Sequence, residues 1–152
     1  MLEALIDRPE YERLAPGVVA ALRALSQTVD ASGLDKTLVE IVKVRASQLN
    51  GCAFCLQFHL NIARQLDVPA AKLDLIAVWR EAPLYTPRER AALAWTEALT
   101  RMNQAPVDPA AEAALRAEFT LPEIAMLTAA IGAINAWNRI AGALRFGPPT
   151  AG

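Results

Sequence analysis

The chain has 152 residues, a formal net charge of −1 from 15 basic and 16 acidic side chains, and a hydrophobic fraction of 54% with 6% aromatic residues. This length fits one domain, and a near-neutral charge without a basic stripe argues against nucleic-acid binding. The apolar residues are mostly Ala and Leu, which favours helices over strands. Because the apolar fraction is high for a small monomer, we expect a homo-oligomer.

The start of the chain does not resemble a secretory signal, since it has an acidic residue, Glu3, and no basic start before an apolar run. The most apolar stretch, residues 124–137, is too short to cross a bilayer. We therefore expect a cytoplasmic protein without membrane contacts. In that compartment, two closely spaced cysteines more often serve redox chemistry or metal binding than a structural disulfide.

Helical spacing dominates the whole chain, and no segment alternates as a strand does. The first four predicted helices cover residues 16–30, 35–50, 52–66 and 70–79. Capping boxes that start at Thr86 and Thr120 predict helices ending near residues 102 and 145, and a shorter helix is expected over residues 109–118. The sequence therefore predicts one all-α domain over residues 1–152.

The two cysteines and the single histidine lie within eight consecutive residues, as Cys52, Cys55 and His59. On a helix, this spacing places all three side chains on one face. Gly51 is a helix stop, so the cysteines lie near the N-terminus of the next helix, where the helix dipole favours a thiolate. The two sulfurs can form a disulfide, and the imidazole can accept a thiol proton.

Glu40 lies on the helix that precedes this cluster. If the two helices form an antiparallel hairpin, Glu40 is about 16 Å and His59 about 12 Å from the turn, so Glu40 can orient the imidazole or relay a proton. Two other interpretations remain open. Cys52, Cys55 and His59 could bind a metal, but a structural zinc site normally has four ligands, and only Glu40 is a possible fourth. Alternatively, the cysteines could simply be core residues.

The segment from Glu40 to His59 reads EIVKVRASQLNGCAFCLQFH, with the spacing Glu-x11-Cys-x2-Cys-x3-His. This pattern resembles the AhpD-like alkylhydroperoxidase family, within the carboxymuconolactone decarboxylase superfamily. Segments 79–81, 89–95 and 135–139 resemble one branch of that family. The resemblance extends over about residues 15 to 145.

The resemblance implies an all-α, AhpD-like helical domain that carries its CxxC pair at the N-terminus of a helix in a helical hairpin. It implies a homo-oligomer that reduces small organic hydroperoxides. Carried over by position, Cys55 is the peroxidatic thiol, Cys52 the resolving thiol, and His59 and Glu40 the proton relay. No bound cofactor or metal is expected. An external dithiol-bearing protein, such as a lipoyl-bearing partner, would reduce the disulfide.

Phe54 stands between the cysteines, where founding members of the family carry a His. This departure removes one relay group, so a general protein-disulfide oxidoreductase or redox sensor is the alternative function. The true decarboxylases generally lack the dithiol, which argues against lactone decarboxylation. Four residues are candidates for a substrate pocket, the last three of which fit helix-end packing or a subunit contact better: Phe54, Trp79, Arg80 and Tyr85.

Asn135, Asn138 and Arg139 share one face of the last predicted helix, at positions i, i+3 and i+4. We expect them to hydrogen-bond buried helix ends or a neighbouring subunit.

Overall fold

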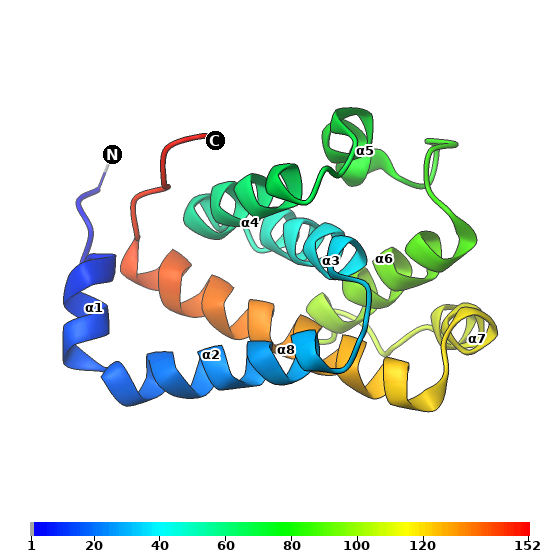
Figure 1. Cartoon of the computed structure of the whole chain (residues 1–152), viewed down its shortest axis with the longest axis horizontal. Helices are drawn as coiled ribbons and strands as arrows, with labels where there is room; N and C mark the ends of the chain where they lie inside the picture. The colour runs from blue at the N-terminus through cyan, green and yellow to red at the C-terminus, as the bar shows by residue number, and fades with distance from the viewer. Residues whose placement is uncertain (1) are drawn as a thin grey trace.

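The computed structural model describes residues 2–152, and within them every regular element is a helix (Figure 1). In chain order these are α1 (Arg8–Leu14), α2 (Pro16–Ala31), α3 (Lys36–Leu49), α4 (Ala53–Gln65), α5 (Ala70–Leu75), the 3-10 helix η1 (Ile76–Val78), α6 (Pro87–Thr100), α7 (Pro109–Glu118) and α8 (Leu121–Leu144). The prediction of an all-α fold is confirmed.

Side-chain caps explain why most helices begin where the sequence predicts. Asp35 accepts a hydrogen bond from the backbone of Thr37 at the start of α3. The capping boxes of Thr86 and Thr120 are both formed, each with a Glu three residues later. Each such cap satisfies backbone N–H groups that would otherwise lack a partner. The predicted helix starts in this part of the chain therefore agree closely with the structure.

Two parts of the prediction differ from the structure. The helix α1 was not predicted, because it buries none of its residues and so shows no apolar periodicity. It is instead fixed by a local cap, in which the Asp7 side chain accepts a hydrogen bond from the backbone of Glu10. The helix predicted over residues 70–79 is divided into α5 and η1.

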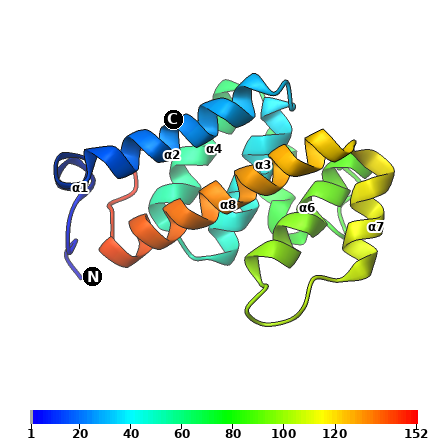
Figure 2. The same cartoon turned by 90° about the horizontal axis from the view of Figure 1, so that it is seen from below.

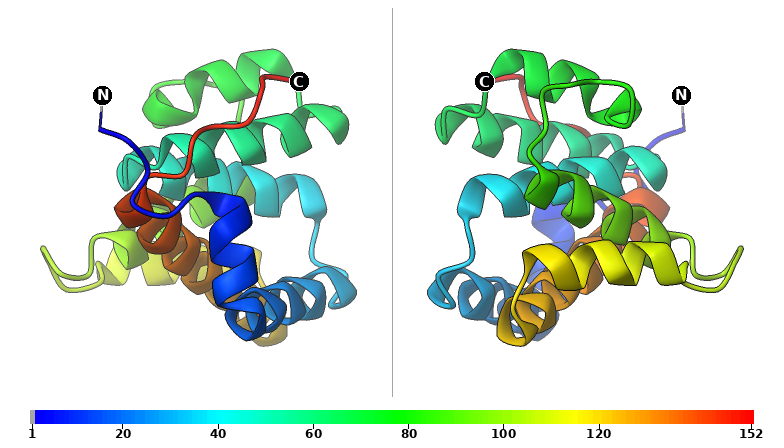
Figure 3. Two further views of the ribbon diagram at one scale, coloured as in Figure 1. Left: turned by 90° about the vertical axis from the view of Figure 1, so that its left-hand side faces the viewer. Right: turned by 90° about the vertical axis from the view of Figure 1, so that its right-hand side faces the viewer.

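The helix α3 is the centre of the fold, because it packs against α4, α6 and α8. Viewed from either end, α3 lies between α4 on one side and α2 with α8 on the other (Figure 3). Its buried apolar residues accordingly contribute to three separate clusters: Val39 and Val42 face α8, Ile41 and Val44 face α4 and η1, and Ala46 lies beside the cysteines. A helix that is surrounded in this way holds its side chains in fixed positions.

The arm formed by α1 and α2 is much less buried. The helix α2 runs along α8 (Figure 2), yet it buries only Val19 and Val29. Val18 and Leu25 remain 45% and 37% exposed. An exposed apolar face of this kind is compatible with the predicted homo-oligomer, which remains a prediction.

The last helix, α8, has 24 residues and is the longest element. Among residues 2–152, neither α8 nor any other helix combines the length and the apolar character that crossing a membrane requires.

Candidate functional site

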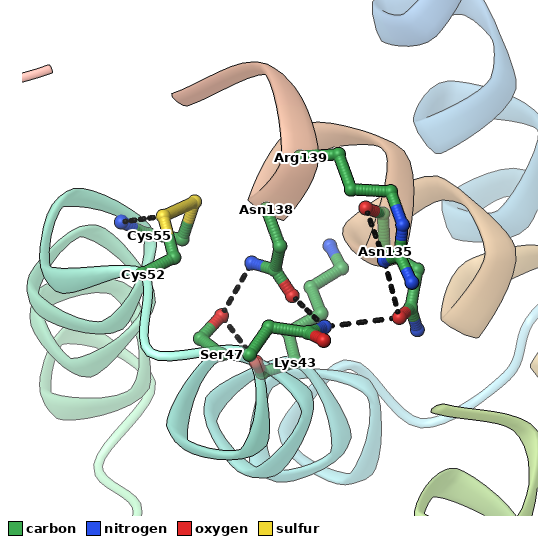
Figure 4. The surroundings of a disulfide bond; sticks show 8 residues. Lys43, Ser47, Cys52, Cys55, Asn135, Asn138 and Arg139 are labelled. Carbon is green, nitrogen blue, oxygen red and sulfur yellow. Dashed lines mark hydrogen bonds between the residues drawn. A yellow bond between two sulfur atoms is a disulfide. The ribbon is translucent and has the colours of Figure 1, made fainter. Parts of the chain in front are cut away.

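Cys52 and Cys55 form a disulfide at the N-terminus of α4, directly after the turn that ends α3 (Figure 4). Gly51 forms this turn with a φ of +65°, a conformation that favours glycine. Cys52 is the N-cap of α4, and its sulfur accepts a hydrogen bond of 3.2 Å from the backbone N–H of Cys55. The predicted position of the CxxC pair, in a hairpin of two helices, is confirmed.

A network of buried and half-buried polar side chains connects this turn to α8 (Figure 4). The amide of Asn50 donates to the side-chain oxygens of Asn135 and Asn138, at 2.9 and 2.8 Å. Asn138 in turn donates to the hydroxyl of Ser47, which donates to the backbone carbonyl of Lys43. Because Asn138 and Ser47 are buried, each of these bonds replaces hydration that the groups have lost. The network holds the end of α3, and therefore the start of α4, in place.

The structure brings Glu40 and His59 together across α3 and α4. Nδ1 of His59 lies 2.7 Å from Oε2 of Glu40, and both side chains are buried. A carboxylate can only accept, so the proton of this bond belongs to Nδ1 and the neutral imidazole is left with Nε2 as its basic nitrogen. The other carboxylate oxygen, Oε1, accepts a hydrogen bond of 3.2 Å from Lys43.

The charge of Glu40 depends on these two partners. Burial on its own would raise the pKa of the Glu40 carboxyl, but the hydrogen bond and charge of His59, together with Lys43, hold the pKa below its ordinary value. The carboxylate is therefore ionised at neutral pH and holds the imidazole in a single orientation.

A cavity of about 480 Å³ opens beside these residues and is enclosed by α1, α2, α3, α4 and α8. Cys55, His59 and Glu40 line the cavity, whereas Cys52 does not. The volume is within the range of small-molecule pockets, roughly 300 to 1,000 Å³. An organic molecule in the cavity would therefore have access to Cys55 and the His59–Glu40 pair but not to Cys52.

Aromatic rings cover the CxxC turn. Phe54 stacks on Phe58 with a centroid distance of 5.8 Å and meets Phe146 edge-on at 5.5 Å. The guanidinium of Arg8, on α1, lies over the rings of Phe54 and Phe58, at 5.4 and 5.5 Å. Phe54 lines the cavity. It also packs against Arg8 and so joins α1 to the start of α4.

The other three pocket candidates, Trp79, Arg80 and Tyr85, do not line this cavity. Trp79 and Arg80 instead donate hydrogen bonds of 2.9 and 2.5 Å to the carboxylate of Glu97, which is also bound by Arg45. These contacts fit the packing role that the sequence favours, because the two side chains complete the coordination of a buried carboxylate.

Tyr85 has a comparable role, because its hydroxyl donates to the backbone carbonyl of Lys72. Burial, with the nearby charge of Glu89, raises the pKa of Tyr85 to about 12. The phenol is therefore a neutral hydrogen-bond donor at any physiological pH.

Several residues of the cavity were missed by the sequence analysis. Arg8 and Tyr11 belong to α1, which lacks any periodic signal, and Trp137 lies on the apolar α8. Lys43 was detectable, since it lies three residues after Glu40 and so shares its helix face.

No group of three or more His, Cys, Asp or Glu side chains within residues 2–152 is arranged to hold a metal ion. The four residues considered as ligands are occupied otherwise, with Cys52 and Cys55 joined to each other and His59 bound to Glu40.

Comparison with known proteins agrees with this geometry. Residues 16–98 match the sequence pattern of the carboxymuconolactone decarboxylase family. The uncharacterized protein YdfG of Bacillus subtilis is 30% identical over 134 residues, which cover 88% of this chain and 91% of YdfG.

Solved structures show the same fold. The protein of unknown function ATU0492 from Agrobacterium tumefaciens has a TM-score of 0.91 and 39% identity, over 97% of this chain and 99% of its own. A peroxidase-related protein from Silicibacter has a TM-score of 0.75 and 27% identity, over 86% of this chain and 70% of its own. The debrominase Bmp8, at 22% identity and a TM-score of 0.80 over 89% and 73% of the two chains, is similar in fold alone.

Proposed function

The chain belongs to the carboxymuconolactone decarboxylase family and is AhpD-like, and we propose that it is a thiol-dependent hydroperoxide reductase. In this proposal, Cys55 is the peroxidatic thiol, Cys52 the resolving thiol, and His59 with Glu40 the proton relay.

One observation carries the proposal: of the two cysteines, only Cys55 lines the cavity, where it is accompanied by His59. A peroxide that enters the cavity lies beside Cys55 and beside His59, whose imidazole is oriented by Glu40. Cys52 does not line the cavity, and its sulfur is bonded to the sulfur of Cys55. This arrangement supports Cys55 as the thiol that attacks and Cys52 as the thiol that resolves.

The proposed reaction has two steps. In the first step, His59 accepts the proton of the Cys55 thiol, and the thiolate attacks the terminal oxygen of the hydroperoxide. The O–O bond breaks and Cys55 becomes a sulfenic acid. The leaving alkoxide takes the proton from His59 and departs as an alcohol. The Cys52 thiol then attacks the sulfenic sulfur, which forms the disulfide and releases water. An external dithiol returns both cysteines to thiols by disulfide exchange and is itself oxidised to a disulfide.

The reductant must reach sulfurs that are nearly enclosed, since Cys52 and Cys55 are only 2% and 3% exposed. A small dithiol, or one carried on a flexible arm such as a lipoyl group, fits this access better than a thiol fixed on a globular surface. The same burial disfavours the alternative, a general protein-disulfide oxidoreductase. The debrominase Bmp8 has the same fold, so the reduction of a hydroperoxide by this protein has to be measured directly.

We further propose that the protein acts as a homo-oligomer in the cytoplasm. The exposed Val18 and Leu25 on α2 offer apolar surface for a subunit contact. A reducing compartment would supply the dithiol that the cycle needs.

The proposal is tested by steady-state consumption of cumene hydroperoxide with dithiothreitol as the reductant. We expect the wild type to turn over and Cys55→Ser to be inactive. Turnover of insulin disulfides without any consumption of cumene hydroperoxide would instead establish the disulfide oxidoreductase. Failure of both reactions would contradict a thiol oxidoreductase.

A further inference from the structure

The buried pair of Glu40 and His59 has a third member, Lys43. Its ammonium donates to Oε1 of Glu40 at 3.2 Å, while Oε2 of the same carboxylate is bound by His59. The three side chains are between 8% and 14% exposed. Glu40 therefore bridges a cation and an imidazole at the wall of the cavity.

We propose that Lys43 is a positioning residue of the dithiol site, which fixes the Glu40 carboxylate so that it accepts from Nδ1 of His59 and leaves Nε2 as the proton acceptor. The consequence of this inference for catalysis rests on the proposed function.

The first argument is geometric. Glu40 and Lys43 are three residues apart on α3, so they share a helix face, and that face is turned to the cavity. On an exposed helix such a pair contributes only a few tenths of a kcal/mol. Here the pair is almost enclosed, and removal of one partner would leave the other charge with insufficient compensation.

The second argument is electrostatic. A carboxylate and an imidazole that share a hydrogen bond titrate as one unit, and a cation next to that unit opposes the uptake of a further proton. Lys43 therefore favours the ionised state of Glu40. In agreement with this, Lys43 is among the causes that lower the pKa of Glu40.

The other charged groups near the site do not replace this contact. Those that line the cavity are Arg8 and Glu12 on α1, Arg23 and Asp30 on α2, and Lys36 at the start of α3, while the lining residues of α8 are uncharged. Glu12 pairs with both Arg8 and Arg23. On α6, Glu97 faces Arg45 and Arg80. Within residues 2–152, the side chain of Glu40 bonds only to Lys43 and His59.

The test uses the fact that His59 is the only histidine in the chain. The imidazole signals of the reduced, untagged protein are followed by NMR from acid to alkaline pH in the wild type, Lys43→Met and Lys43→Arg. We expect the midpoint to move to higher pH in Lys43→Met, by about half a pH unit or more, because a nearby cation has been removed. Lys43→Arg should restore the wild-type midpoint.

Lys72→Met is the matched control. Lys72 bonds to Glu89 at 2.7 Å and is similarly enclosed, but it does not line the cavity. We expect this variant to lose stability without moving the imidazole midpoint. An unchanged midpoint in a folded Lys43→Met, or an equal shift in Lys72→Met, would overturn the proposal.

A second measurement separates the positioning role from the proposed function. The rate of peroxide-driven thiol loss is recorded against pH, and its acidic limb should move to higher pH in Lys43→Met as the imidazole midpoint does. Absence of thiol loss in the wild type would refute the proposed function, while the NMR titration would still decide the role of Lys43. If peroxide drives thiol loss but the acidic limb of the pH profile is the same in Lys43→Met and the wild type, the role of Lys43 is overturned and the proposed function stands.

Discussion

His59 on α4 and Glu40 on α3, 19 residues apart in sequence, meet at 2.7 Å at the wall of the cavity that Cys55 also lines. The carboxylate fixes which nitrogen of the imidazole carries the proton. The imidazole that we propose as the base of the dithiol is therefore oriented before any molecule enters the cavity.

Replacement of Glu40 by Gln should slow peroxide-driven thiol loss by about 10²-fold, because the amide can no longer stabilise the imidazolium that forms when His59 takes a proton. The rate constant is measured on the reduced protein at neutral pH. Glu112→Gln, which removes an exposed carboxylate paired with Arg116 on α7, is the control and should leave the rate unchanged. Equal rates for Glu40→Gln and the wild type would exclude Glu40 from the relay.

The stability of the protein should fall in acid because of Glu97. Burial would raise the pKa of Glu97, but the hydrogen bonds of Trp79, Arg80 and Arg45 hold it below the ordinary value of 4.5. A lowered pKa in the folded state means that the carboxylate stabilises the fold above pH 4.5 and that this contribution is lost as the pH falls through the folded-state pKa.

The variant Glu97→Gln tests this link. At pH 7 it should lower the free energy of unfolding by about 3 kcal/mol, since Arg45 is left buried without its partner. The difference from the wild type should shrink as the pH falls below 4.5. Urea denaturation at a series of pH values checks this, and a difference that does not vary with pH would contradict it.

The network at the turn before Cys52 should contribute to stability. In Asn138→Ala, Asn50 and Ser47 lose buried hydrogen-bond partners, so the free energy of unfolding should fall by about 1 to 3 kcal/mol. Asn61→Ala, at a site where the amide bonds to the exposed C-terminal segment, should cost much less. A cost for Asn138→Ala no larger than that for Asn61→Ala would show that the network does not hold the turn.

Phe54 should control access to the disulfide. In Phe54→Ala, Arg8, Phe58 and Phe146 lose the ring on which they pack, so the covering of the CxxC turn is opened. We expect dithiothreitol to reduce the disulfide several-fold faster than in the wild type. Phe58→Ala, which leaves Phe54 against Phe146, should have a smaller effect. A rate that is unchanged in Phe54→Ala would contradict a covering role.

The sequence predicts the helical hairpin and its cysteines well, because both depend on local signals. The caps of Asp35 and Thr86, the stop at Gly51 and the spacing of Cys52 and Cys55 all act within one or two helical turns. The roles expected for Asn135 and Asn138 are also found, since both bond to Asn50 at the half-buried end of α3.

What the sequence could not provide depends on packing between distant elements. Arg139, expected to bond a buried helix end or another subunit, donates instead to Asn135 on its own helix. The packing partner of Trp79 and Arg80 is Glu97, which carries no recognisable signal in the sequence. The residues of α1 that line the cavity could not be predicted either, since contacts such as that of Arg8 over Phe54 follow no periodicity in the sequence.

The central claim, that Cys55 attacks a hydroperoxide and Cys52 resolves it, is tested most directly in a single turnover. The reduced protein is mixed with one equivalent of cumene hydroperoxide, and its free thiols are counted over time. We predict rapid loss of both thiols in the wild type, no rapid loss in Cys55→Ser, and a sulfenic acid on Cys55 that dimedone traps in Cys52→Ser. Thiol loss no faster than that of a free cysteine, or equal loss in Cys55→Ser, would contradict the account.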